Sequence, residues 1–196
     1  QETIFLIFAF IYNMKKIIFS FLRQYLFWIL FFDFIRIVFL LYYFRILLAE
    51  KIPFGDIPGV LWFSIKLDLA TASYIMVLPF FLLLIQTVWS PRWFNYINKV
   101  YAGLAIFIYS LTAAGEMGIY AEWKTKLTYK VLKYFSHPSE IYNSAETGTF
   151  YFLLVLFIFL FLAGFLSYLK VFYLDIIKER RYFVFSLLML VIIPPL

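Results

Sequence analysis

Long apolar segments follow one another along this chain, and their length is what most constrains the fold. A helix needs about 20 consecutive apolar residues to cross the hydrocarbon core of a bilayer. Segments of at least that length are residues 17–44, 60–89, 96–120 and 150–169. A fifth apolar segment, residues 182–196, is shorter and ends in Pro194 and Pro195, which do not continue a helix. The sequence therefore predicts an all-α polytopic membrane bundle with about five transmembrane helices.

The composition agrees with that class. Hydrophobic residues make up 65% of the 196 residues and charged residues 14%, whereas soluble domains are about 45–50% apolar and about 25% charged. The chain has no cysteine and one histidine, His137, so we expect neither disulfides nor a His or Cys metal cluster, and no cofactor in this chain. The formal charge of +6 indicates loops that face lipid headgroups, so membrane phospholipids are the expected partners. No long Lys/Arg run is present for a nucleic acid to follow.

Basic residues suggest a natural start and an orientation. Met14-Lys15-Lys16 precedes an apolar segment, as at the cytoplasmic N-terminus of many membrane proteins. Residues 1–13 are therefore predicted to be an upstream extension and residues 14–196 the membrane domain; a further apolar segment or a signal remnant is the alternative. With the N-terminus inside, nine basic residues near the segment ends lie inside and six outside. We expect the N-terminus inside and the C-terminus outside.

The segment between the third and fourth apolar stretches is amphipathic. From Trp123 onward apolar residues recur with helical spacing, whereas Lys126, Lys130 and Lys133 follow a separate stripe. This pattern predicts a basic interfacial helix between spans three and four, lying in the headgroup layer and ending before Pro138. Its candidate lipid-contact residues are Glu122, Trp123, Lys126, Lys130 and Lys133. A solvated loop helix without a ligand is the alternative.

Charged residues also occur within the first three apolar segments: Asp33, Arg36, Lys66, Asp68 and Glu116. Asp33 and Arg36 are three residues apart and share a helix face. Lys66 and Asp68 are two apart, roughly 200° around a helix, so they cannot pair with each other. Charge in hydrocarbon is costly and faces the bundle interior or the interface. We expect Lys66 to extend to the headgroups, and Asp68 to turn inward and meet a cation such as Arg36 or polar groups of the third span. A structural ion-pair lock and a headgroup or ion site both stay open.

Three segments carry a resemblance to a known family. They read "FFDFIRIVFLLYY" (31–43), "IKLDLATASYIMVLPF" (65–80) and "AAGEMGIYAEWKTKL" (113–127). Together they resemble the N-terminal transmembrane domain of lipoteichoic acid synthase-like proteins, of the Bacteroidetes type, in the sulfatase/alkaline phosphatase superfamily. The resemblance extends over residues 14–196. Lys66 stands where the family more often has Arg, and a lysine lacks the bidentate fork for a phosphate.

The resemblance implies a five-span anchor followed, after residue 196, by an extracytoplasmic catalytic domain that binds a divalent metal. The implied function is the membrane anchor of a phosphoglycerol/phosphoethanolamine-type transferase or sulfatase acting on cell-envelope substrates in the bacterial cytoplasmic (inner) membrane. This chain alone would have no activity, no catalytic residue is transferred to it, and its own C-terminal catalytic domain would be its partner. The alternatives are a small self-contained transporter or channel-like bundle, with Lys66, Asp68 and Glu116 as an ion path, or a membrane scaffold protein.

Overall fold

The computed structural model describes residues 2–49, 53, 55–88, 93–123 and 147–173. All secondary structure within these ranges is helical, which confirms the predicted all-α class. The elements are α1 (Glu2–Tyr42), α2 (Phe44–Ala49), α3 (Asp56–Val88), α4 (Trp93–Trp123), α7 (Thr147–Ser167) and the π-helix η1 (Tyr168–Phe172).

Four helical stretches are long and apolar enough to cross a membrane. They are Ile18–Tyr42, Asp56–Leu82, Trp93–Tyr120 and Gly148–Phe172. Each coincides with one of the four full-length segments expected from the sequence, and the shorter fifth segment, 182–196, lies outside the described residues. Helix α1 runs without a break through Met14, so the boundary predicted there is not marked by a helix end. That residues 1–13 are an extension stays a prediction.

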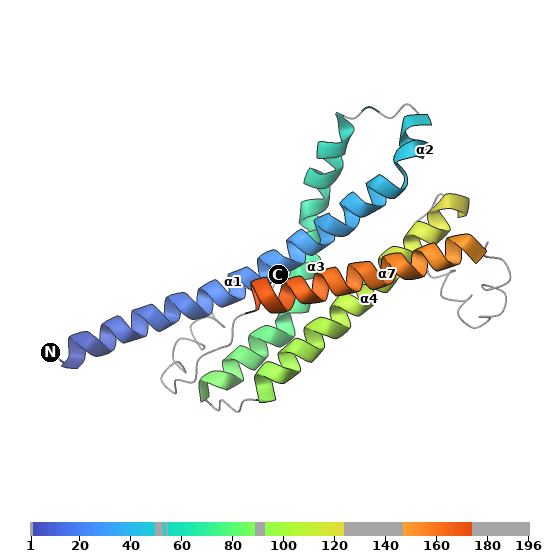
Figure 1. Cartoon of the computed structure of the whole chain (residues 1–196). Coiled ribbons are helices and arrows are strands. Elements are labelled where there is room, and N and C mark those ends of the chain that lie inside the picture. Colours follow the sequence, from blue (N-terminus) through green and yellow to red (C-terminus); the bar gives the residue numbers. More distant parts are fainter. Residues whose placement is uncertain (1, 50–52, 54, 89–92, 124–146, 174–196) are drawn as a thin grey trace.

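The long helices run alternately up and down (Figure 1). Helix α1 leads away from the N-terminus, α3 returns and crosses it, and α4 runs back again. Helix α7 then lies along α4 in the opposite direction, and η1 at its end contacts α1. The bundle thus contains two closely packed helix pairs, α1–α3 and α4–α7. The candidate site described below lies between α1 and α3.

An aromatic cluster on α1 occupies the centre of the bundle. Phe27, Trp28, Phe31 and Phe32 are all buried, with Trp28 only 1% exposed. They pack against small and aliphatic side chains of α3 and α4, such as Ala72 and Ile106. Many Leu, Phe and Ile residues on the outer faces are exposed instead. That distribution suits a protein whose solvent is hydrocarbon, because apolar side chains there gain nothing by turning inward.

Glycine permits α7 to pass close to its neighbours. A Cβ on Gly164 would lie 2.6 Å from Cε2 of Phe31 in α1 and 3.0 Å from Cγ2 of Ile106 in α4. Small residues at helix contacts are the usual means of close packing in membranes, where van der Waals contact drives association. Gly164 is therefore the point at which α7 packs on both α1 and α4.

Proline within α3 is accommodated by a hydrogen bond from α4. Pro79 has no backbone N–H, so the carbonyl of Ile75, one turn earlier, has no donor from that position. The hydroxyl of Tyr101 in α4 donates to this carbonyl at 3.1 Å. Neighbouring helices commonly satisfy backbone groups that a proline frees in a membrane span. The Tyr101 hydroxyl therefore links α4 to α3 at the position where α3 is intrinsically weakest.

Candidate functional site

Arg36 is the centre of a charged network between α1 and α3. Its Nη1 and Nη2 donate to Oδ2 and Oδ1 of Asp68, both at 2.9 Å. The same Nη1 also donates to Oδ1 of Asp33, one helical turn earlier, at 3.0 Å. We call Asp33, Arg36 and Asp68 the Arg36 network. The Arg36–Asp68 contact is bidentate, the geometry in which guanidinium and carboxylate bind most strongly.

The register of α3 explains why Asp68 faces inward. Ala72, one turn later, and Ile75 and Met76, two turns later, are buried residues of the same helix face. Asp68 therefore begins the stripe by which α3 packs on α1, and the contact with Arg36 expected from the sequence is present. Its side chain is only 6% exposed. A carboxylate so buried requires a partner, because an unpaired charge in a low-dielectric interior is strongly unfavourable.

The three members of the network differ in exposure. The side chains of Arg36 and Asp33 are 22% and 29% exposed, against 6% for Asp68. Asp33 also contributes a single hydrogen bond within its own helix, whereas Asp68 joins two helices. The Arg36–Asp68 pair is therefore the part of the network that joins α1 to α3. Asp33 provides a second, more accessible carboxylate to the same guanidinium.

Lys66 and Glu116 do not join this network. Lys66 is exposed, two residues from buried Asp68, as their angular separation on a helix requires. Glu116 is half-buried in α4. Arg36 forms its ion pairs with Asp33 and Asp68, and neither pair includes Lys66 or Glu116. The structure therefore brings together three of the five charged residues predicted from the sequence.

The predicted interfacial residues are only partly described. Glu122 and Trp123 are the last two residues of α4, which continues past the end of the predicted third span. The three lysines of the predicted stripe, Lys126, Lys130 and Lys133, lie outside the described residues. Their proposed contact with the headgroup layer stays a prediction.

A second polar cluster lies at the other end of the bundle and was not predicted. Asn98 Nδ2 of α4 and the hydroxyl of Tyr168 of η1 both donate to Oε1 of Gln24 in α1, at 3.3 and 3.1 Å. All three residues are buried. We call them the amide cluster. Its sequence signal is an uncharged amide in each of two apolar spans, Gln24 and Asn98. Such residues are easily overlooked beside charged ones, although buried amides also require partners.

The π-helical turn η1 orients two tyrosines at this end. The backbone N–H of Tyr173 donates to the carbonyl of Tyr168 at 2.7 Å, an i→i+5 bond that brings residues five apart onto one face. Both side chains are buried, with ring centroids 5.7 Å apart. The Nζ of Lys99 lies 4.6 Å from the centroid of the Tyr173 ring, a cation–π contact. Lys99 is thereby held beside the end of η1.

The described residues contain no group of three or more His, Cys, Asp or Glu side chains placed to hold a metal ion. No protein-family model, no characterised protein and no solved structure matches this chain.

Proposed function

We propose that residues 14–196 are the membrane-anchoring domain of an extracytoplasmic phosphoglycerol/phosphoethanolamine-type transferase or sulfatase that acts on cell-envelope substrates. The Arg36–Asp68 pair is the observation that carries this proposal. Arg36 belongs to the segment "FFDFIR" and Asp68 to "IKLDL", two of the segments that resemble this family. The two charges neutralise each other between α1 and α3. This arrangement suits an anchor, in which intramembrane charges hold helices together rather than bind or transport a ligand.

The same geometry disfavours the transporter alternative. An ion path needs charged or polar groups that face a shared cavity inside the bundle. Both oxygens of the Asp68 carboxylate are bound by Arg36, and Lys66 is exposed on another face of α3. Glu116 lies on α4 outside the Arg36 network. The charged residues suggested for an ion path therefore have three different environments in the bundle.

The proposal includes an orientation in the bacterial cytoplasmic membrane, with the N-terminus inside. Lys66, ten residues after Asp56 at the start of α3, would then extend its side chain along the helix toward the outer phosphates. The chain has no native cysteine, so single cysteines can be labelled without background. A membrane-impermeant maleimide added outside should label Ser136→Cys but not Lys178→Cys. Labelling of Lys178→Cys alone would invert the orientation.

The function itself is tested by the coding sequence that follows residue 196 and by flux measurements. We expect a downstream sulfatase-type domain with a divalent metal site, whose transferase or hydrolase activity is lost on treatment with a chelator. A stop codon or an unrelated domain at that position would refute the proposal. The isolated chain in liposomes should pass no more protons or potassium than protein-free liposomes. Flux that is abolished by Asp68→Asn would favour the transporter.

A further inference from the structure

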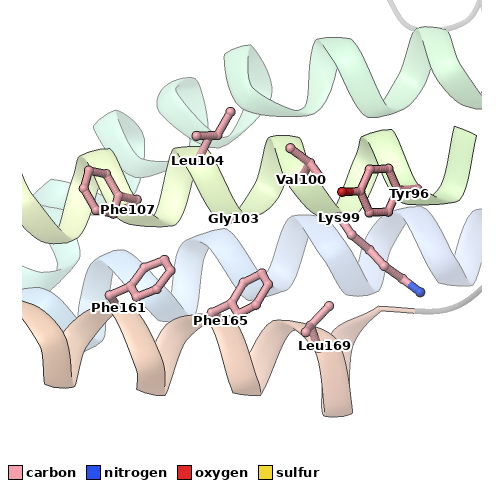
Figure 2. A pocket seen from close by; sticks show the side chains of 9 residues that line it. All are labelled: Tyr96, Lys99, Val100, Gly103, Leu104, Phe107, Phe161, Phe165 and Leu169. Atoms are coloured by element: carbon pink, nitrogen blue, oxygen red, sulfur yellow. The ribbon is translucent and has the colours of Figure 1, made fainter. Parts of the chain in front are cut away.

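A groove on the lipid-facing side of α4 and α7 is separate from the Arg36 network. It has a volume of about 420 Å³ and is lined almost wholly by apolar side chains (Figure 2). Gly103, one of the lining residues, lets Phe165 of α7 pack closely on α4, because a Cβ there would lie 3.0 Å from that ring. Figure 2 shows Phe161 and Phe165 projecting from α7 toward α4. The groove is of a size that binds small ligands.

Aromatic rings give the groove a rigid wall. Phe161 and Phe165 are stacked along α7, with centroids 5.7 Å apart and planes 8° apart. Phe107 of α4 contacts Phe161 edge-on, with ring centroids 5.8 Å apart, and lies at one end of the groove (Figure 2). Stacked and edge-to-face rings hold one another in place, so the groove is preformed. Since it lies on transmembrane stretches of both helices, the surrounding medium that can enter it is hydrocarbon.

The opposite end of the groove is polar and lies near the membrane surface. Trp93 and Tyr96, in the first turn of α4, are 50% and 70% exposed, as is typical of the aromatic belt at the interface. Lys99 follows Trp93 by six residues, roughly 9 Å along the helix axis. Its side chain extends from α4 toward the end of the α7–η1 segment (Figure 2). A lysine at this depth can place its ammonium among lipid phosphates.

We propose that this groove binds one acyl chain of an anionic phospholipid whose phosphate contacts the Lys99 ammonium. The apolar wall selects hydrocarbon, and Lys99 is the one charged side chain among the lining residues that the structure describes. A zwitterionic headgroup would bring an ammonium for which the described lining residues provide no anion, so net negative lipids should bind more tightly. The site is on a different helix pair from the Arg36 network, and it does not depend on the proposed anchoring function.

The headgroup contact is tested by native mass spectrometry of the chain released from nanodiscs. The nanodiscs contain phosphatidylcholine with a minor fraction of phosphatidylglycerol. Lys99→Gln should retain about tenfold less phosphatidylglycerol than the parent, the effect of losing one charge-assisted hydrogen bond, and equal amounts of phosphatidylcholine. Lys99→Arg should retain the parent level. The matched control is Lys15→Gln, which removes the same charge from an exposed position at the start of the first span and should change neither lipid.

The acyl-chain contact is tested by filling the groove. Leu104 and Ile108 are both 58% exposed on α4, but only Leu104 lines the groove. Leu104→Trp should lower retention of both lipids, whereas Ile108→Trp should not; thermal unfolding in detergent verifies that both variants fold. The proposal is overturned if Lys99→Gln keeps the parent level of phosphatidylglycerol, if Lys15→Gln loses as much, or if the two tryptophan variants behave alike.

Discussion

The two helix pairs of this bundle are held together by different forces. Helices α1 and α3 are joined by the Arg36–Asp68 ion pair and by the hydroxyl of Tyr25, which donates to the carbonyl of Leu69 at 2.8 Å. Helices α4 and α7 have close contacts at glycines instead: a Cβ on Gly118 would lie 2.7 Å from Cδ1 of Leu153. One interface is polar and directional, and the other depends on shape.

Both solutions answer the same physical problem. Lipid tails are as apolar as Leu or Phe, so burying an apolar face gives helices in a membrane little reason to associate. Association must come from polar bonds that lipid cannot replace, or from contacts closer than lipid can make. The α1–α3 pair should therefore be sensitive to loss of a charge, and the α4–α7 pair to added volume.

Removal of Asp68 should have the largest effect. Asp68→Ala leaves the Arg36 guanidinium in the bundle without its bidentate partner, and breaking a buried pair in this way costs about 3–5 kcal/mol. We expect that loss in the free energy of unfolding, measured by denaturation in detergent. Lys66→Ala is the matched control, because Lys66 is exposed two residues away, and it should leave stability nearly unchanged.

A charge-free version sharpens this first test. Replacing both partners, Arg36→Met with Asp68→Leu, should restore much of the lost stability, because well-packed apolar residues can substitute for a buried ion pair. If Asp68→Ala unfolds like the parent while Lys66→Ala is unstable, the roles assigned to these two residues are reversed.

Added volume at Gly164 should be the next largest effect. The methyl group of Gly164→Ala meets Phe31 and Ile106 at 2.6 and 3.0 Å, and overpacking a well-packed contact costs about 1–3 kcal/mol. Gly148→Ala is the control, since nothing lies within 4 Å of a Cβ at that position. Equal unfolding midpoints for the two variants in detergent would show that α7 does not depend on close approach.

Loss of the Tyr101 hydroxyl should give the smallest effect. Tyr101→Phe leaves the carbonyl of Ile75 without its interhelical donor, at a cost of about 1–2 kcal/mol. In a Pro79→Ala background the restored backbone N–H can bond that carbonyl, so Tyr101→Phe should then cost much less. A double-mutant cycle of unfolding free energies measures the difference. Identical costs in both backgrounds would mean that the hydroxyl does not compensate for the proline.

Local periodicity determined a large part of what the structure contains. The lengths of the apolar segments predicted four full spans, and the three-residue spacing of Asp33 and Arg36 placed both on one face of α1. The two-residue spacing of Lys66 and Asp68 separated an exposed cation from a buried anion. These features follow from the 3.6-residue turn of a single helix, so they can be predicted without knowing which helices are its neighbours.

Only the tertiary structure decided which residues meet across helices. The sequence left two kinds of partner open for Asp68, a cation such as Arg36 or polar groups of the third span, and the crossing of α1 and α3 brings Asp68 to Arg36. The amide cluster joins Gln24 to Tyr168 across 144 positions. In a membrane span the residues that face lipid and those that face the core are both Leu, Phe and Ile, so hydrophobic periodicity does not identify the packed face. That face is set by shape and by a few polar partners, which exist only once the helices are assembled.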